Sequence, residues 1–190
     1  MRKLMRGAVV AAVVLAAASV AAEPQQARGP FDRWGQVWGT WVWRIHVSPT
    51  IANPSLVTLH IDGTVSVTDG NMFGSPTAAS RRYLTPAHGV WVRTGWQSVG
   101  GTSLYLISDA TTGALVAWGR ARTSLTFADD FDSFQGRVFV ETLPCAAGPP
   151  VSCPDPLSAD AKWAANPNMP PDGFPVSATR LERVPAGPLP

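Results

Sequence analysis

Hydrophobic and polar residues alternate in short runs from residue 31 to residue 143, and no stretch there keeps the 3.6-residue period of a helix. Turn-forming residues separate the runs. An alternation with a period of two predicts strands that bury one face. The predicted strands are Gly39–Val47, Ser55–His60, Thr64–Thr68, Gly89–Thr94, Thr102–Ser108, Ala114–Ala121, Ser124–Phe127 and Gln135–Leu143. The pattern therefore predicts an all-β fold, either a sandwich or a barrel, and we favour a single antiparallel up-and-down barrel of about eight strands.

The segment from Ser55 to Thr68 shows which face of a strand is buried. A two-residue turn would place apolar residues opposite polar ones on both faces of the hairpin. A three-residue loop, Ile61–Gly63, with Gly63 in the left-handed region, places Leu59 opposite Val65 instead. Only this register gives one continuous apolar face, so we predict the three-residue loop.

The same reasoning assigns an inward face to four more segments. Charged positions belong in water, and small residues on an inward face leave room inside the barrel. A closed barrel of eight strands is about the size that holds one small ligand. The predicted inward residues are Trp41, Trp43, Ile45, Val47, Val90, Val92, Leu115, Ala117, Gly119, Ala121, Val138 and Val140.

The composition changes after residue 143. Proline accounts for 12 of the 47 residues from 144 to 190, and little strand-like alternation remains. We therefore predict a barrel domain at residues 31–143 and a proline-rich C-terminal extension at 144–190 that builds no core of its own. Within the extension, Asp160–Asn166 has the composition of one or two helical turns, with Trp163 docked on the barrel.

Cys145 and Cys153 are the only cysteines, eight residues apart around two prolines. Two close cysteines in an oxidising compartment usually pair, so we predict one disulfide that closes a small loop. The alternative is a metal site, but no histidine or second cysteine pair lies near them in the sequence.

The first 22 residues have the pattern of a secretory signal peptide, with basic residues before an apolar run that ends in small residues. Its apolar run is shorter than the roughly 18 residues of a membrane span. We expect an exported protein, periplasmic or secreted, with no integral membrane span after the signal is removed. Three of the 15 basic residues lie in this segment and all 13 acidic residues lie after it, which leaves 12 against 13. This balance argues against nucleic acid as a partner.

Gly39-Thr40-Trp41, at the start of the first predicted strand, resembles the Gly-x-Trp motif of the lipocalins and the wider calycin group. The resemblance covers about residues 34–143. It implies that Trp41 closes the floor of the barrel, that Arg137 packs across it, and that the interior binds a small hydrophobic molecule. The segment from Val57 to Trp91 is also similar to bacterial exported calycin-like barrels. Allene-oxide-cyclase-type barrels have a similar layout and imply cyclisation or isomerisation without a cofactor.

The first functional hypothesis is therefore a container for a small hydrophobic molecule, without cofactor or metal. Eight tryptophans suit an aromatic or polyene ligand, although a small barrel also fills its own core with such residues. Arg82 and Tyr83, in the long loop Asn71–Ala87, are expected near the barrel mouth. The expected interior residues are Trp41, Trp43, Leu59, Ala117 and Gly119.

Two other hypotheses remain. If His46 and His60 faced inward, His60, Arg93 and Glu141 would supply a base, an oxyanion partner and an acid for a cofactor-independent cyclase or isomerase. Surface histidines are the simpler interpretation. Alternatively, the barrel is solid and the protein is a structural or partner-binding module, with exposed Trp91 and Trp118 or the proline-rich extension as the contact surface. The sequence does not name the ligand or the oligomeric state.

Overall fold

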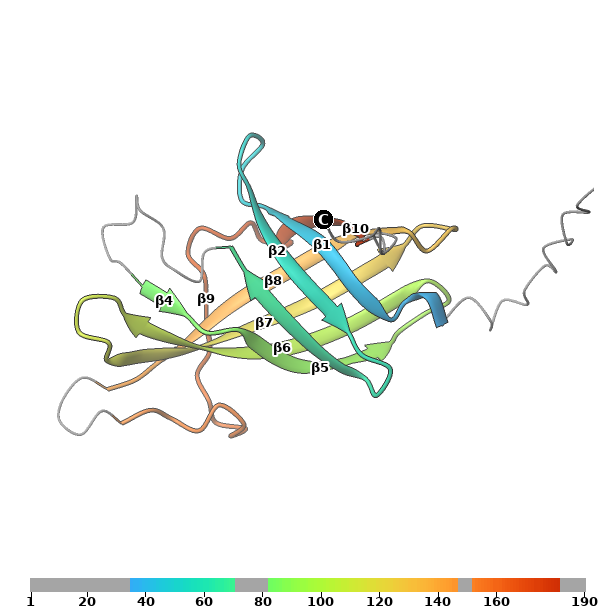
Figure 1. Ribbon diagram of the computed structural model, residues 1–190. Coiled ribbons are helices and arrows are strands. Elements are labelled where there is room, and N and C mark those ends of the chain that lie inside the picture. The colour runs from blue at the N-terminus through green and yellow to red at the C-terminus, as the bar shows by residue number, and fades with distance from the viewer. Residues whose placement is uncertain (1–34, 71–81, 147–151, 182–190) are drawn as a thin grey trace, which may run out of the picture.

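The computed structural model describes residues 35–70, 82–146 and 152–181, so the predicted signal peptide lies outside the described residues. The described chain is all-β, with no α-helix (Figure 1). No helix in this part of the chain has the length and apolar character needed to cross a bilayer. The strands are β1 (Gly39–His46), β2 (Ala52–Leu59), β3 (Thr64–Asp69), β4 (Arg82–Leu84), β5 (Ala87–Arg93), β6 (Ser98–Asp109), β7 (Leu115–Phe127), β8 (Ser133–Pro144), β9 (Ala164–Ala165) and β10 (Phe174–Arg180).

Eight of these strands form a closed antiparallel barrel in the order β10-β1-β2-β3-β5-β6-β7-β8, and β10 pairs back with β8. The all-β class and the up-and-down barrel are therefore confirmed, and the closed barrel is consistent with a calycin-like architecture. The eight strands differ from the predicted set. The two predicted strands Ala114–Ala121 and Ser124–Phe127 are one continuous strand, β7, and the eighth barrel strand is β10.

Strand β10 lies within residues 144–190, outside the predicted barrel range. Its inward side chains are Phe174, Val176 and Ala178, all buried, and they alternate with outward Pro175. The high proline content of the segment obscured this alternation. The predicted helical turns at Asp160–Asn166 are wrong, because this stretch has no helix and contains the two-residue strand β9, which pairs with β8.

The hairpin of β2 and β3 has the predicted register, with Leu59 opposite Val65. Gly63 has φ 83°, the left-handed conformation that the three-residue loop requires. The Asp62 carboxylate accepts a hydrogen bond from the Thr64 backbone N–H at 2.9 Å and so fixes the turn. The apolar face of this hairpin therefore points into the barrel, as the pattern predicted.

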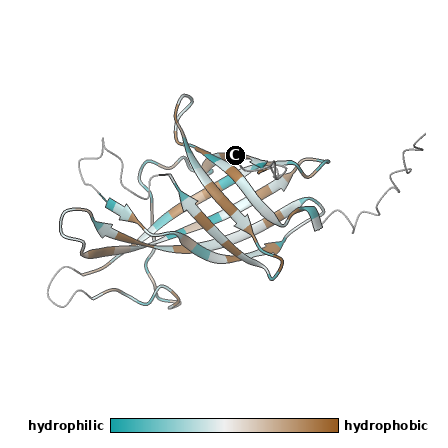
Figure 2. Ribbon diagram, viewed as in Figure 1, coloured by the Kyte–Doolittle hydropathy of each residue, from teal (hydrophilic) through white to brown (hydrophobic). Residues whose placement is uncertain are grey.

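Inward orientation is confirmed for Trp41 and Trp43 but is wrong for Val90 and Val92, which are 58% and 61% exposed. Their neighbour Trp91 turns inward, and its indole N–H donates to the His60 carbonyl at 3.0 Å. The inward position of Trp91 packs the largest side chain of β5 against the core and gives its indole N–H a partner. Figure 2 shows the resulting alternation of brown and paler segments along the strands.

Val47 was also predicted inward, and this is wrong. The residue follows the end of β1 and is 39% exposed. The inward face of β1 thus ends with Ile45, which packs against the core.

An aromatic cluster closes one end of the barrel. Trp41 is fully buried, with ring centroids 5.3 Å from Phe127 and 5.1 Å from Phe134, and Phe131 stacks on Phe127 at 5.7 Å. The Trp41 indole N–H donates to the Val37 carbonyl at 3.2 Å, so its polar atom is satisfied. This end is therefore solid.

An arginine does pack across Trp41, but it is Arg180 of β10 and not Arg137. The Arg180 guanidinium carbon lies 4.4 Å from the ring centroid, and its terminal nitrogens donate to the backbone carbonyls of Trp38 and Phe131. Arg137 instead pairs with Asp172 at 2.8 Å on the outer surface. The resemblance implied the right type of contact and the wrong residue.

The chain between β8 and β10 runs along the outside of the barrel. Cys145 and Cys153 form the predicted disulfide, and Ala146 bridges to Ser152 beside it. Further on, the Trp163 ring lies 4.2 Å from the Arg120 guanidinium carbon. Trp163 therefore contacts the outer face of the barrel, as predicted, although not from a helix.

Candidate functional site

A cavity of ≈ 90 Å³ lies inside the barrel above the aromatic cluster. Alternating positions on the strands supply its walls, because each strand directs every second side chain inward. The lining is mainly aliphatic and aromatic. The apolar lining residues are Trp43, Ile45, Val57, Leu59, Val65, Val67, Leu84, Ala87, Trp91, Val99, Ala121, Leu125, Val138 and Val140.

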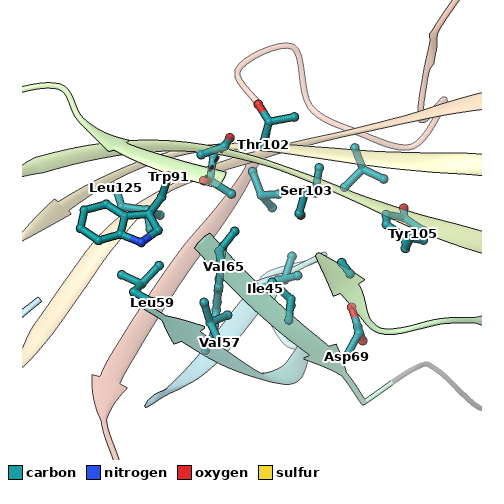
Figure 3. A pocket seen from close by; sticks show the side chains of 18 of the residues that line it. Ile45, Val57, Leu59, Val65, Asp69, Trp91, Thr102, Ser103, Tyr105 and Leu125 are labelled. Atoms are coloured by element: carbon teal, nitrogen blue, oxygen red, sulfur yellow. Dashed lines mark hydrogen bonds between the residues drawn. The ribbon is translucent and has the colours of Figure 1, made fainter. Parts of the chain in front are cut away.

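One end of the cavity is polar. The lining of the cavity includes the polar residues Asp69, Ser103 and Tyr105. Figure 3 shows Asp69 and Tyr105 together at one end, while Trp91 lies at the other. The cavity thus has an apolar body and a polar end.

Burial raises the pKa of Tyr105 to about 12, and the negative charge of Asp69 adds to the effect. The Tyr105 phenol therefore keeps its proton over the whole physiological range. It can donate or accept a hydrogen bond at the polar end of the cavity.

The small residue Gly119 makes room for Tyr105. A Cβ atom at Gly119 would overlap the Tyr105 ring, its neighbour across β6 and β7. Ala117 lies opposite Ile107, and both are buried. Neither Ala117 nor Gly119 lines the cavity, whereas Ala121, further along the same face, does.

Two buried polar atoms near the polar end lack a hydrogen-bond partner among the described residues. They are the indole nitrogen Nε1 of Trp43, which lines the cavity, and the hydroxyl of Ser55. Ser55 lies opposite both Trp43 and Asp69 in the sheet. Buried polar atoms normally have partners, so these two atoms set this end of the interior apart.

The residues predicted for the container are only partly brought together. Trp43 and Leu59 line the cavity, while Trp41 lies in the solid end below it. Arg82 and Tyr83 begin β4 and are exposed, directly before Leu84 and Thr85, which line the cavity. The rest of the predicted mouth loop, residues 71–81, lies outside the described residues.

The three residues of the enzyme hypothesis lie at different places around the barrel. His60 is exposed in the β2–β3 turn, with its ring 3.2 Å from the Ser66 hydroxyl. Arg93 ends β5, and its Nε donates to the Gly95 carbonyl at 2.9 Å. Glu141 is on the outer face of β8.

Glu141 accepts hydrogen bonds from Arg120 at 2.8 Å and from Arg122 at 3.0 Å. Partial burial acts to raise the pKa of Glu141, but the two arginines outweigh it and hold the pKa below its ordinary value. His46 also lies on the outside, with Nε2 3.0 Å from the Ser177 hydroxyl. Both groups therefore have structural partners on the outer surface.

Sequence reasoning missed the polar residues of the cavity. The signal for Asp69 was present, because it continues the inward series of Val65 and Val67 by one more step of two. Ser103 and Tyr105 were harder to place, because both faces of β6 carry apolar residues. In the described part of the chain, no group of three histidine, cysteine or acidic residues could hold a metal ion.

Comparison with family models, with curated proteins and with solved structures finds no match to this chain. The function must therefore be argued from the cavity and its lining. The two features that matter are its small apolar body and its polar end.

Proposed function

We propose that this protein is an exported, lipocalin-like barrel that binds a small hydrophobic molecule in its interior. The observation that carries the proposal is the apolar cavity of ≈ 90 Å³ above a solid aromatic floor. Pockets for drug-sized ligands begin at roughly 300 Å³. An apolar cavity of about 150 Å³ can hold one benzene molecule, so this one encloses on the order of four non-hydrogen atoms.

The lipocalin-like part of the proposal is supported by two neighbouring features. Gly39-Thr40-Trp41 begins the first barrel strand, and an arginine of the last strand, Arg180, packs across the Trp41 ring. The first feature is a sequence motif, and the second is a contact that the tryptophan of that motif makes in the structure. Together they support a barrel with a closed floor and a ligand site above it.

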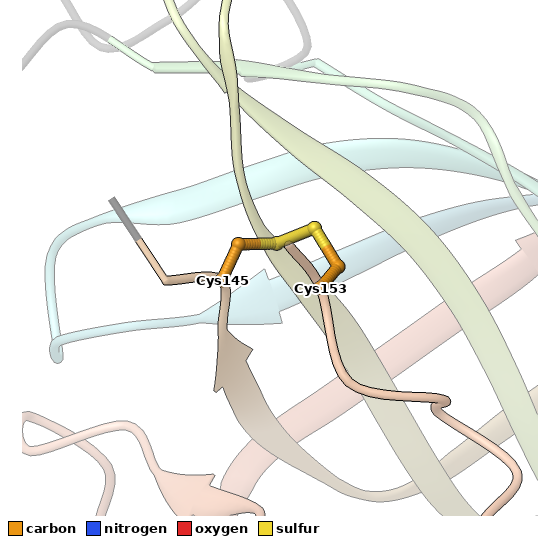
Figure 4. Close-up of a disulfide and its surroundings, with 2 residues drawn as sticks. All are labelled: Cys145 and Cys153. Carbon is orange, nitrogen blue, oxygen red and sulfur yellow. A yellow bond between two sulfur atoms is a disulfide. The ribbon is translucent and has the colours of Figure 1, made fainter. Parts of the chain in front are cut away.

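Export is supported by the signal-like pattern of the first 22 residues and by the Cys145–Cys153 disulfide (Figure 4). Disulfides persist in the periplasm and outside the cell and are rare in the cytosol. We therefore place the protein in the periplasm or the extracellular medium.

We do not propose the isomerase alternative, because His60, Arg93 and Glu141 lie in a turn, at a strand end and on the outer surface. None of the three lines the cavity described above. The structure thus offers no observation that favours their acting on one substrate.

Filling the cavity tests the proposal. Ala121 lines it, so Ala121→Leu would occupy part of the space that a ligand needs. We expect n-butane and xenon to bind the protein, and Ala121→Leu to weaken both by at least about tenfold. Chemical-shift changes of backbone amides and the ¹²⁹Xe resonance measure the two affinities.

Ser124→Leu is the matched control, because it adds the same side chain to the exposed outer face of the same strand. It should leave both affinities unchanged. Absence of binding to the unaltered protein, or equal binding by Ala121→Leu, would contradict the proposed interior site.

A further inference from the structure

A second hollow, the outer groove, lies on the outside of the barrel, and we propose that it binds a small hydroxylated anion through Arg44. The outer groove has a volume of ≈ 180 Å³ and crosses β1, β10 and β8, which are neighbours in the sheet (Figure 1). Its lining shares no residue with the lining of the interior cavity. The outward side chains of the outer groove are Val42, Arg44, Ser133, Gln135, Ser177 and Thr179.

Strand β10 forms the floor of the outer groove. Its Ser177 and Thr179 point outward, because they alternate with the buried residues Val176 and Ala178. Both outward side chains are short, whereas the neighbouring strand β1 carries the long side chain of Arg44. The outer groove is therefore a trough along β10 between longer side chains.

Polar side chains from the three strands form two rows across this trough. In the first row, Ser177 lies opposite Arg44 of β1 on one side and opposite Gln135 of β8 on the other. In the second row, Thr179 lies opposite Ser133 of β8. Residues directly opposite each other in a sheet have Cβ atoms about 5 Å apart, so one small molecule can contact several of these groups.

The guanidinium group of Arg44 is exposed and forms no hydrogen bond or ion pair with the described residues. Other arginines on the outer face of the barrel are paired. Arg120 lies 2.8 Å from Glu141, and Arg137 lies 2.8 Å from Asp172. Arg44 therefore has its full set of donors available for a ligand.

The charge of Arg44 is not balanced by a neighbouring carboxylate. Of the described residues, none that lines the outer groove is acidic. Asp132, directly before Ser133, lies 3.5 Å from Arg180 and so has a cation of its own. A guanidinium group donates two parallel hydrogen bonds to the oxygens of a carboxylate or a phosphate group. The outer groove therefore favours an anion.

The other polar side chains select a ligand that carries hydroxyl groups. Those of Ser133, Gln135 and Thr179 form no hydrogen bond with the described residues, and the Ser177 hydroxyl lies 3.0 Å from Nε2 of His46. Hydroxyl and amide groups both donate and accept, as ligand hydroxyls do. An apolar cavity of about 150 Å³ holds one benzene molecule, so the outer groove has room for on the order of seven non-hydrogen atoms. A three-carbon hydroxy acid has this size.

Four three-carbon probes test the proposal at pH 7 by amide NMR titration: glycerate, glycerol 3-phosphate, propanoate and glycerol. We expect at least one of the two hydroxylated anions, glycerate or glycerol 3-phosphate, to bind with a dissociation constant on the order of 1 mM and to shift amides of β1, β8 and β10. Which of the two binds more tightly distinguishes a carboxylate from a phosphate ester. Propanoate, which lacks hydroxyls, and glycerol, which lacks the charge, should bind at least about tenfold more weakly.

Two variants test the assigned residues. Arg44→Gln removes the charge from the outer groove, and Thr179→Leu fills its floor, so each should weaken binding of the hydroxylated anion by at least about tenfold. Arg122→Gln and Thr126→Leu are the matched controls, because they make the same changes at exposed positions of β7 outside the outer groove. Both controls should leave the affinity unchanged.

The inference is overturned if neither hydroxylated anion binds, or if the shifted amides lie outside β1, β8 and β10. Equal binding by glycerol would remove the role of the charge, and equal binding by propanoate would remove the role of the hydroxyl groups. An unchanged affinity in Arg44→Gln would also overturn the inference. None of these results depends on whether the interior cavity binds a ligand.

Discussion

At the scale of single residues, Arg180 links the floor of the barrel to its neighbours. Its guanidinium group lies over the Trp41 ring and donates to the carbonyls of Trp38 and Phe131. These carbonyls lie outside the strand pairs, so the arginine supplies hydrogen bonds that the sheet does not. A stacked, half-buried guanidinium with two backbone acceptors contributes more than an exposed ion pair.

We therefore expect Arg180→Met to lower the free energy of unfolding by about 2 kcal/mol, from the lost cation–π contact and charged hydrogen bonds. Arg137→Met is the matched control, because Arg137 pairs with Asp172 on the surface, where both side chains are largely solvated. It should cost less than about 1 kcal/mol. Chemical denaturation measures both values, and a larger loss for Arg137→Met would refute this role of Arg180.

The sequence predicted residues well where the two faces of a strand differ in polarity. Leu59 stands between Thr58 and His60, and Trp43 is followed by Arg44; Leu59 and Trp43 both line the cavity. Prediction failed at Val90-Trp91-Val92, where both faces are apolar and the alternation does not distinguish the inward face. It also missed Tyr105, whose inward orientation depends on the long-range pairing of β6 with Gly119.

At the scale of elements, β10 determines whether the sheet closes. It pairs with β1 on one side and with β8 on the other. Without it, two long strands would expose unpaired backbone groups, which favours association with other chains. The alternation of Phe174, Val176 and Ala178 was readable in the sequence, but neighbouring prolines made the segment resemble an extension. The pairing of β1 with β10 joins distant parts of the chain, so it cannot be read from the sequence of residues 174–180 alone.

A charge on the inward face of β10 tests its role in closing the barrel. Val176 is buried opposite Gly136, so Val176→Asp would place an unpaired carboxylate in the core. We expect it to lower the free energy of unfolding by about 3–5 kcal/mol. Thr179→Asp adds the same charge to the exposed face and should cost less than about 1 kcal/mol. Similar losses for both variants would contradict the assigned faces of β10.

At the scale of the whole molecule, Glu141 connects the barrel to the segment that wraps around it. Its carboxylate accepts from Arg120 and Arg122 of β7, and Arg120 in turn stacks on Trp163. Glu141 is also paired with β9 through its backbone register with Ala165. The ionised side chain of Glu141 therefore joins β8 to β7, and its protonation weakens the pairs with Arg120 and Arg122.

This linkage predicts how stability changes with pH. Partial burial acts to raise the pKa of Glu141, but hydrogen bonds from Arg120 and Arg122 lower it below its ordinary 4.5, so the folded state favours the ionised form. The resulting stabilisation is present above pH 4.5 and is lost as the pH falls through the lowered pKa of the folded state. Glu141→Gln should therefore be less stable than the unaltered protein at pH 7, and the difference should shrink toward pH 3.

Urea denaturation from pH 7 to pH 3 measures this difference, with Arg122→Met as the companion variant. Arg122→Met removes one of the two partners, so we expect a smaller difference from the unaltered protein with the same pH direction. A difference that stays constant across this range would show that the charge of Glu141 does not stabilise the fold, and that Glu141→Gln destabilises it through packing alone. A difference that grows toward pH 3 would reverse the sign of the linkage and contradict the lowered pKa.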